Sequence, residues 1–341
     1  MNKSPLVHII ILNWNSPEDT IDCLRSLSKI EYRNFKVVLI DNASGDNSVQ
    51  EITTYLSNDE YYLNYGKIDL GLNLERSTSD RDYLKHEKLV MVLNKENSGF
   101  AKGSNIGIEL AINEDCDYVL LLNNDTVVEP NFLNVLLKHK LENPEYAALT
   151  PQIRYEGRKD YIWNCGGRLI LWGFWKKYYY DNTNINTIEE EKDLKLITFV
   201  TGCALLFNPN ELGKLTEDYF FGEEDFEFSL RLRNMNKKMG CAMNSLIYHK
   251  VGGSLEDVNA KGKRYIHLLN RFINTRKNNM NVSWFFLVVV ALNYNFIYLI
   301  IKEKMSLVNA SKFTYNLFLD ALRLNRVTHK KFINTIFKHK W

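Results

Sequence analysis

A carboxylate at the end of a short hydrophobic run is the first feature of this sequence that could do chemistry. Asp125 follows Asn123 and Asn124, which come directly after the apolar residues 118–122. Mg²⁺ and Mn²⁺ prefer hard oxygen ligands, commonly one or two carboxylates together with substrate phosphates. A cation held by Asp125 could stabilise the charge that develops on a departing diphosphate. The other interpretation of Asp125 is a turn or cap residue, since Asn-Asp pairs often follow strands.

Two further segments offer groups to the same kind of ligand. Asp41 ends the apolar run 35–40 and can accept hydrogen bonds from a base or a ribose. Residues 97–105 place glycine and other small residues ahead of a helical stretch, where backbone can approach a ligand closely. Lys102 in this segment could meet a phosphate, although a solvent-facing helix position would explain it equally well.

The elements that must position these residues are apolar runs that alternate with helical stretches. Uninterrupted hydrophobic strands are typical of parallel sheets covered on both faces by helices, so the pattern predicts an α/β doubly wound fold. Ligands bind such sheets beyond the carboxyl ends of the strands. Asn or Asp residues follow every one of the four runs, at 7–12, 35–40, 89–93 and 118–122.

The remainder of the chain has a different character. Residues 57–87 are polar, rich in tyrosine and without a clear period, and we expect an insertion or long loop there. Strands are predicted at 197–207 and 240–248 with a helix at 225–234 between them, and the pattern is mostly helical from 263 onward. We therefore expect a domain at 1–262, with a donor half at about 1–127 and an acceptor half at about 128–262, and a helical region at 263–341.

Residues 163–180 are packed with aromatic side chains. Aromatic rings stack on sugar faces and anchor at lipid interfaces, so this segment could form a wall for an acceptor. Packing in a core would explain the same residues equally well.

The charge distribution and one apolar stretch indicate a membrane surface. The net charge of the 341 residues is +2, which gives no general argument for nucleic-acid binding. From Lys302 onward, however, the only acidic residues are Glu303 and Asp320. Residues 282–301 are long enough to span a bilayer but contain Asn293 and Asn295. A helix on the membrane surface, a true span or re-entrant element, and a buried core helix all remain open.

The five cysteines and the N-terminal region bear on the compartment. The cysteines are odd in number and form no C-x-x-C pair, so a disulfide framework or a zinc site is not expected, and buried reduced thiols are. The apolar run 6–12 is too short for a signal peptide. We expect a cytoplasmic protein that is peripheral to, or anchored at, the cytoplasmic face of the cell membrane.

Ordered blocks along the chain resemble those of family 2 glycosyltransferases, most closely the rhamnosyltransferase-like branch. Their order and spacing are far more specific than any single block, and the resemblance extends over roughly residues 5–280. The blocks lie at 7–15, 41–44, 97–101, 123–125, 201–206, 220–227 and 249–254.

The resemblance implies a GT-A (Rossmann-like) fold and an inverting hexosyltransferase reaction, in which the acceptor oxygen attacks the anomeric carbon directly. Asp125 matches the last position of the DXD-type metal motif of the family, and because Asn occupies 123 and 124 a single carboxylate remains. Asp41 matches the position that holds the nucleoside. His249 matches a residue near the diphosphate, as a metal ligand or a phosphate contact.

Glu224 and Asp225 match the acidic pair that supplies the general base, and we assign that role to Asp225. An inverting reaction needs one base near the acceptor hydroxyl. The competing interpretation is a helix N-terminus, where acidic residues complement the helix dipole.

The sequence thus predicts a glycosyltransferase that uses Mg²⁺ or Mn²⁺ and a dTDP- or UDP-sugar, with rhamnose or a related sugar transferred to a cell-surface polysaccharide or lipid-diphosphate-linked acceptor. The alternative is a non-catalytic nucleotide-sugar-binding scaffold on the same fold. An oxidoreductase is disfavoured because no G-x-G-x-x-G turn follows the first run. A nucleotidyltransferase would need a glycine-rich, basic N-terminal loop. The predicted site comprises Asp225 and Glu224 for catalysis, Asp125 and His249 for the metal, and Asn13, Asn15, Asp41, Asn97, Gly99, Lys102 and Asn124 for the donor.

Overall fold

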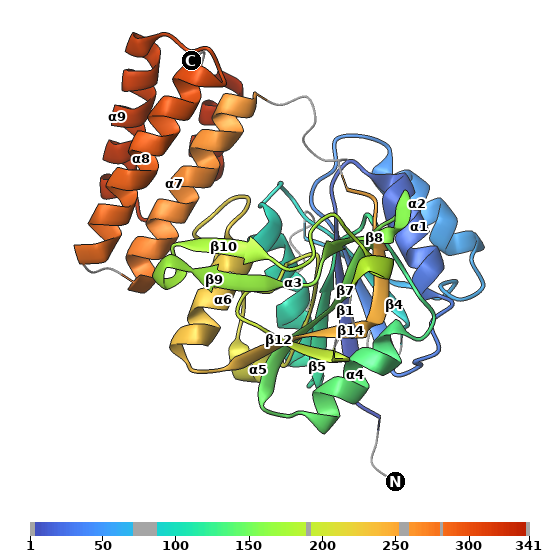
Figure 1. The fold of residues 1–341 in the computed structure, drawn as a ribbon. Coiled ribbons are helices and arrows are strands. Elements are labelled where there is room, and N and C mark those ends of the chain that lie inside the picture. Colours follow the sequence, from blue (N-terminus) through green and yellow to red (C-terminus); the bar gives the residue numbers. More distant parts are fainter. Residues whose placement is uncertain (1–3, 71–86, 189–191, 252–258, 280–281, 339–341) are drawn as a thin grey trace.

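The computed structural model describes residues 4–70, 87–188, 192–251, 259–279 and 282–338, which form an α/β part followed by a helical bundle (Figure 1). The central sheet has the strand order β11-β8-β7-β13-β5-β1-β2-β4-β3. One half of it is parallel. This half consists of β1 (Val7–Asn13), β2 (Phe35–Asp41), β3 (Gly66–Asp69), β4 (Leu89–Leu93) and β5 (Tyr118–Leu122).

The other half of the sheet is mixed, which corrects the expectation of a parallel sheet. β13 (Ala204–Phe207) runs antiparallel to both β5 and β7 (Tyr146–Tyr155). The long β14 (Lys238–His249) pairs with β7, with β12 (Leu194–Ile197) and with β6 (Thr126–Val128). The remaining strands are β8 (Arg158–Asn164) and β11 (Thr183–Asn184) at the edge, and the separate hairpin of β9 (Gly167–Ile170) and β10 (Trp175–Tyr178).

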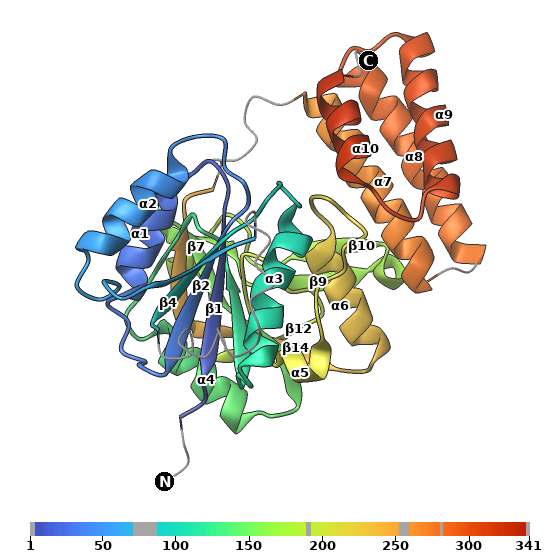
Figure 2. The same cartoon turned by 180° about the vertical axis from the view of Figure 1, so that it is seen from behind.

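Helices cover both faces of the sheet, and this explains the uninterrupted hydrophobic strands. Ile9 and Ile11 pack on one face against α1 (Pro17–Leu27), α2 (Ser48–Asn58) and α4 (Phe132–Glu142). Ile10 packs on the other face against α3 (Phe100–Asn113), with α5 (Pro209–Leu212) and α6 (Glu224–Asn234) further along (Figure 2). A Cβ on Gly107 would lie 2.7 Å from Ile10 Cγ2, so α3 lies close to the strands because this residue is glycine.

Two segments differ from their expected structure. Part of 57–87 is ordered: Tyr62 is buried, its hydroxyl donates to the Leu24 carbonyl (3.0 Å), and β3 adds a parallel edge strand, whereas 71–86 lie outside the described residues. The predicted strand 197–207 is divided into β12 and β13. The intervening backbone turns toward α6 and the β9–β10 hairpin, because the Val200 amide donates to Ser229 Oγ (3.1 Å) and the Phe199 amide to the Gly167 carbonyl (3.1 Å).

The C-terminal helices form a bundle with a hydrophobic core of its own. In Figure 2, α10 lies along α7. Within the described part of the chain, one stretch, Trp284–Ile301 of α8, is long and apolar enough to cross a membrane by length and composition, and 28% of it is buried. Asn295 faces the interior and accepts a hydrogen bond from Arg264 Nε (2.5 Å), whereas Asn293 is exposed. The bundle comprises α7 (Ala260–Asn279), α8 (Val282–Ile301), α9 (Leu307–Arg323), α10 (His329–Ile333) and the π-helical turn η4 (Asn334–Lys338).

Candidate active site

The carboxyl ends of β1 and β2 are joined through Asn13 and Asp41, which lie opposite each other in register. Asn13 Nδ2 donates to Asp41 Oδ1 (2.8 Å), and Asn13 Oδ1 accepts from the Thr20 hydroxyl (2.8 Å). The Ser44 amide and hydroxyl donate to Asp41 at 3.1 and 2.6 Å. Both Asn13 and Asp41 are buried. They hold the 41–44 turn in place, and direct contact with a donor stays a prediction for each.

Asn15 connects the end of β1 to the same turn. Its backbone has a φ of 52°, in the left-handed region that asparagine tolerates better than most residues. Its amide donates to Ser44 Oγ (3.0 Å), and its side-chain carbonyl accepts from the Gly45 amide (2.8 Å). Trp14, to which we assigned no role, is exposed beside this turn. Asn15 therefore shapes the loop at this edge of the sheet.

Asn42 is a buried residue to which the sequence analysis gave no role. Its Nδ2 donates to Asn97 Oδ1 (3.0 Å) and to the Gly99 carbonyl (3.3 Å). Its Oδ1 accepts from Asn94 Nδ2 (3.0 Å) and from the Ser98 amide (3.2 Å). One side chain thus ties the end of β2 to the glycine segment that precedes α3. The only sequence signal for this role is its place directly after Asp41.

Gly99 brings this segment against a distant part of the chain. Its φ is +82°, and a Cβ at this position would lie 2.0 Å from the Phe220 carbonyl oxygen. The Phe100 amide donates to that same oxygen (3.3 Å). Only glycine fits here, because both the backbone conformation and the close approach exclude a side chain.

Two other predicted donor residues lie in contrasting places. The Lys102 side chain is 56% exposed, and its ammonium lies 3.8 Å from Glu96 Oε1. Asn124 is partly buried and donates from Nδ2 to Thr20 Oγ1 (3.0 Å). Lys102 thus lies on the protein surface, whereas Asn124 ties the end of β5 to α1.

Asp125 and His249 lie side by side where β6 and β14 pair. His249 stands opposite Thr126 in the ladder, and its Nε2 is 3.0 Å from Asp125 Oδ1. The two side chains are 8% and 17% exposed, and neither atom has a hydrogen bond of good geometry within the described residues. Two ligand-capable atoms therefore converge and are not satisfied by the protein. This donor set fits a divalent cation that takes its other ligands from substrate phosphates and water.

The described residues contain no group of three or more His, Cys, Asp or Glu side chains that could hold a metal. A site built from one carboxylate and one imidazole is consistent with this result, because phosphate-bound Mg²⁺ or Mn²⁺ needs few protein ligands.

Lys250 braces the strand end that carries His249. Its amide donates to the Asp125 carbonyl (2.9 Å), and its ammonium contacts Asp19 and Asp22 of α1, each at 2.8 Å. Burial disfavours the charge, but these two carboxylates outweigh it and raise the pKa of Lys250 above its usual value. Lys250 thus fixes α1 to the end of β14 beside the candidate metal site.

Segment 218–223, which leads into the acidic pair, is held by the helical bundle. The Phe220 amide donates to the Val327 carbonyl (3.0 Å), and the Val327 amide donates to the Asp218 carbonyl (2.7 Å). Asn270 Nδ2 donates to the carbonyls of Phe221 (3.0 Å) and Gly222 (3.2 Å). The bundle therefore sets the path of the backbone just ahead of α6.

Glu223 is the most tightly held of the three acidic residues. It adopts a left-handed conformation (φ 77°), and its carboxylate receives two hydrogen bonds of 2.7 Å from the Arg271 guanidinium. Both side chains are 2% exposed. Burial favours the neutral acid, but Arg271 outweighs this effect and holds the pKa of Glu223 below its usual value. Glu223 is therefore a structural anion.

Glu224 and Asp225 begin α6 in different surroundings. Burial, and then the neighbouring Asp225, raise the pKa of Glu224 to about 8, and its Oε2 has no hydrogen-bond partner among the described residues. Asp225 lies beside the 201–203 loop: its Cβ is 3.8 Å from where a Cβ on Gly202 would be, and the Phe100 ring adjoins the same point. The described residues give its carboxylate no hydrogen bond.

Residues 201–203 link the two halves of the site. The Cys203 carbonyl accepts from the Asn123 amide (2.8 Å), which places this loop against the strand end that carries Asp125. Gly202 lies next to Asp225. The loop 201–203 thus borders both the strand end that leads to Asp125 and the start of α6 that carries Asp225. The roles of metal ligand and general base stay predictions for the two residues.

The aromatic segment 163–180 contains both buried and exposed side chains, so core packing explains part of it and the wall for an acceptor stays a prediction. The Trp163 ring lies 4.3 Å from the His249 ring, and Phe174 is buried in the bundle core. Trp175 and Tyr178 of the β9–β10 hairpin are exposed, whereas the Trp172 side chain lies outside the described residues.

Lys176 lies between the two exposed aromatic residues of this hairpin. Its ammonium is 4.1 Å from the centre of the Phe199 ring. Burial disfavours its charge, but Asp225 contributes most to raising the pKa of Lys176 above its usual value. The hairpin therefore places a cation and exposed rings beside the acidic pair.

Comparisons with known proteins identify the family of the chain and its fold. The chain matches the sequence model described as "Glycosyl transferase family 2" over residues 8–68 and 79–209. It is also 23% identical over 140 residues to the glycosyltransferase GlyG of Streptococcus pneumoniae serotype 4 (strain ATCC BAA-334 / TIGR4). That match covers 41% of this chain and 36% of GlyG, so it spans about a third of the length of that relative.

Three solved structures resemble the fold. The mannosyltransferase PcManGT from Pyrobaculum calidifontis, in complex with GDP-Man and Mn²⁺, has a TM-score of 0.52 at 14% identity and is matched over 94% of this chain and 76% of its own. GalNAc-T7 with UDP, GalNAc and Mn²⁺ has a TM-score of 0.57 at 14% identity, and the match covers 98% of this chain and 57% of GalNAc-T7. S. aureus TarS 1–349 has a TM-score of 0.51 at 12% identity, and the match covers 98% of this chain and 81% of the TarS chain. At these identities the likeness shows a shared GT-A-like fold.

Proposed function

The chain belongs to glycosyl transferase family 2, and from this premise we propose that it is an inverting, metal-dependent hexosyltransferase. Its donor is a nucleotide-diphosphate sugar, a dTDP- or UDP-linked rhamnose or related sugar. Its acceptor is a cell-surface polysaccharide or a lipid-diphosphate-linked glycan. The observation that supports the proposal is that the loop 201–203 borders both the strand end leading to the Asp125–His249 pair and the Asp225 side chain.

In the proposed reaction an acceptor hydroxyl attacks the anomeric carbon from the face opposite the diphosphate. A bond forms between the acceptor oxygen and that carbon as the bond to the diphosphate oxygen breaks. Asp225 accepts the proton from the hydroxyl, and the nucleoside diphosphate leaves with the electron pair. Single displacement inverts the anomeric configuration. Asp225 is suited to this step because it faces the 201–203 loop and the start of α3.

Asp125 and His249 would hold the Mg²⁺ or Mn²⁺ ion. When bound, such an ion neutralises charge on the diphosphate. Two of the similar structures contain Mn²⁺ with a nucleotide or nucleotide sugar, which supports the proposal without specifying the base or the sugar here. The buried network of Asn13, Asp41 and Asn42 would shape the nucleoside end of the site.

Replacing Asp125 with alanine should remove the metal-dependent part of donor binding. We expect UDP or dTDP compounds to raise the melting temperature of the wild-type protein more with Mn²⁺ than without it, because a ligand that binds only the folded state stabilises it. The Asp125→Ala variant should keep only the metal-independent shift. Asp160→Ala removes an exposed carboxylate from β8 and serves as the matched control.

An unchanged metal-dependent shift in Asp125→Ala would exclude Asp125 from the metal site. A donor-induced shift without sugar transfer to any acceptor would favour the non-catalytic scaffold instead. The joint presence of Asp125, Asp225 and His249 supports the enzyme, because a binding protein has no need of the base.

We further propose that the protein docks on the cytoplasmic face of a membrane through α8 and α9. The inner side of α8 packs in the bundle through Val288, Leu292 and Leu299. Its outer side is unusually apolar for a protein surface. Exposed lysines at 302, 304 and 312 follow along the chain and complement an anionic surface. The exposed apolar residues of the two helices include Phe285, Phe286, Val290, Tyr294, Ile297, Ile301, Leu307, Val308, Tyr315 and Leu322.

Placing two aspartates on this face should release the protein from membranes. Phe286 and Val290 are 65% and 49% exposed, so Phe286→Asp with Val290→Asp should leave the bundle folded. Burying such side chains contributes about 1.5–3 kcal/mol each, and we expect at least about a tenfold weaker affinity for anionic vesicles in a sedimentation assay. Leu63→Asp changes an exposed leucine of the α/β part as a control. Equal sedimentation of all three proteins would contradict docking through α8.

A further inference from the structure

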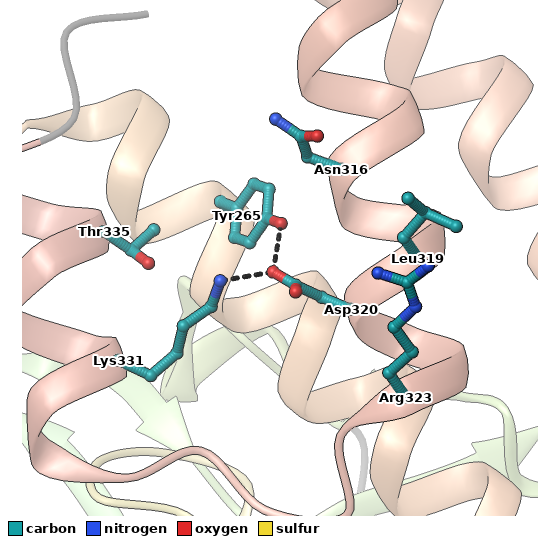
Figure 3. Close-up of a pocket in the computed structure, with 7 residues that line it drawn as sticks. All are labelled: Tyr265, Asn316, Leu319, Asp320, Arg323, Lys331 and Thr335. Atoms are coloured by element: carbon teal, nitrogen blue, oxygen red, sulfur yellow. Dashed lines mark hydrogen bonds and ion pairs between the residues drawn. The ribbon is translucent and has the colours of Figure 1, made fainter.

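A polar cavity lies in the helical bundle, away from the candidate active site (Figure 3). It lies between α7, α9 and the segment formed by α10 and η4, and its volume is about 170 Å³. Because sites for drug-sized ligands measure about 300–1,000 Å³, this cavity is too small for a nucleotide sugar. Its polar lining comprises Tyr265, Asn316, Asp320, Arg323, Lys331 and Thr335.

The charges around the cavity favour an anion. Asp320 accepts hydrogen bonds from the Tyr265 hydroxyl (2.5 Å) and from the Lys331 ammonium, as Figure 3 shows. Its carboxylate is therefore already satisfied by the protein. Arg323 is exposed and has neither an ion pair nor a hydrogen bond within the described ranges. Arg323 and Lys331 against Asp320 leave the lining with a net charge of +1. Lys331 is already paired with Asp320, so the cation left for a ligand is the Arg323 guanidinium, which presents a planar fork of donors.

Thr335 supplies an independent observation that points to a ligand. It is 1% exposed, and its hydroxyl has no hydrogen-bond partner in the part of the chain that the structure describes. A buried hydroxyl without a partner is costly, and most such groups in native proteins are satisfied. Thr335 lines the cavity, so a ligand that reaches this hydroxyl would satisfy it.

We propose that this cavity binds a phosphoryl group. Guanidinium, ammonium, amide and hydroxyl donors on three separate elements surround a space that suits one phosphate. The Arg323 fork would contact two of its oxygens, and Lys331 and Thr335 would contact others. The site does not depend on sugar transfer.

The surface next to the cavity indicates a lipid headgroup as the source of the phosphoryl group. On α9, the exposed residues Val308, Tyr315 and Leu322 recur every seven positions and form one stripe. Asn316 and Arg323, each one position later, form the neighbouring stripe that lines the cavity. Phe318, on the far side of the apolar stripe, contacts Phe285 of α8. The apolar stripe thus joins the proposed membrane-docking face to the cavity, and the lipid source rests on that docking proposal.

The test compares the wild-type protein with three variants of the full chain. Arg323→Gln removes the free cation, Thr335→Val removes the unsatisfied hydroxyl without changing charge, and Arg326→Gln removes an exposed positive charge outside the cavity. Thermal shift with inorganic phosphate and with glycerol phosphate measures the site itself. Binding to phosphatidylcholine vesicles with and without phosphatidate measures the lipid source.

We expect phosphate to stabilise the wild-type protein and Arg326→Gln, and to lose this effect in Arg323→Gln and Thr335→Val. Both arginine variants should lose about fivefold in affinity for phosphatidate vesicles through general electrostatics. Arg323→Gln should lose about a further tenfold, because a charge-assisted contact is removed. The affinity of Thr335→Val for phosphatidate vesicles should be severalfold lower than that of the wild-type protein, and its affinity for pure phosphatidylcholine vesicles should be unchanged.

A phosphate shift that depends on Arg323 and Thr335, with equal vesicle binding by Arg323→Gln and Arg326→Gln, would support the site and identify free phosphate as its ligand. No phosphate shift, together with equal effects of the two arginine variants and no effect of Thr335→Val, would overturn the proposal. None of these measurements uses sugar transfer. A negative result would therefore overturn the phosphoryl site and leave the proposed enzyme activity untouched. The α8 aspartate variant separately tests the docking face.

Discussion

Asp225→Asn should reduce the rate of sugar transfer by about 10²–10⁴-fold while donor binding stays nearly unchanged, because the amide cannot accept the proton from the acceptor hydroxyl. The substitution preserves size and leaves the start of α6 in place, so the loss would fall on kcat. Transfer assays with radiolabelled or fluorescent acceptor, and thermal shift with donor and Mn²⁺, would measure the two effects separately.

Glu224→Gln is the matched control, because it alters the neighbouring carboxyl by the same change. The pKa of Glu224, raised to about 8 by burial, leaves this side chain largely protonated at pH 7, and the amide should replace it with little effect on rate or folding. A base acts in its ionised form. If Glu224 were the base, the rate would rise with pH through about 8, and the largest loss would occur in Glu224→Gln.

Such a pH profile, or substantial transfer by Asp225→Asn, would move the base to Glu224. A loss of donor binding equal to the loss of rate would instead indicate that Asp225 holds the donor.

Arg271→Met should lower the free energy of unfolding by about 3–5 kcal/mol, because it leaves Glu223 as a buried and uncompensated charge. Urea unfolding of the full chain, followed by tryptophan fluorescence, would measure the change. Transfer should fall as well, since the Glu223 backbone leads directly into the acidic pair of α6.

Two further variants separate this effect from simple loss of charge. Arg271→Met combined with Glu223→Gln removes both charges and should recover much of the lost stability. Lys214→Met breaks an exposed ion pair with Glu109 (3.2 Å) and should cost no more than about 1 kcal/mol. If Arg271→Met were as mild as Lys214→Met, the buried pair would contribute little to holding the 218–223 segment.

The parallel half of the sheet could be predicted from the sequence, for a physical reason. Both faces of these strands are covered, so nearly every side chain of β1 and β2 is hydrophobic until the strand ends. The strand ends were visible because a polar residue cannot extend such a run without cost. Asp41, Asp125 and the segment ahead of α3 were identified in this way, and membership of family 2 is confirmed by the match over residues 8–68 and 79–209.

Direction and long-range pairing could not be predicted in the same way. The apolar residues of β13 would read identically in a parallel strand, so its antiparallel direction was missed. The partners of Lys250 in α1 are more than two hundred residues away, and no local pattern signals such a pair. Helical periodicity does not distinguish a surface arginine from one that, like Arg271, is buried and pairs with a distant carboxylate. The roles assigned to the individual site residues stay predictions.

The attachment of segment 218–223 to the bundle limits how chains of this kind can be recombined. A crossover at the start of α7 would seem natural, since it falls between the α/β part and the C-terminal helices. It would nevertheless take Glu223 from one parent and Arg271 from the other, and would divide the hydrogen bonds between Phe220 and Val327. A functional chimera therefore requires the 218–223 segment and the C-terminal helices to be inherited as a single module.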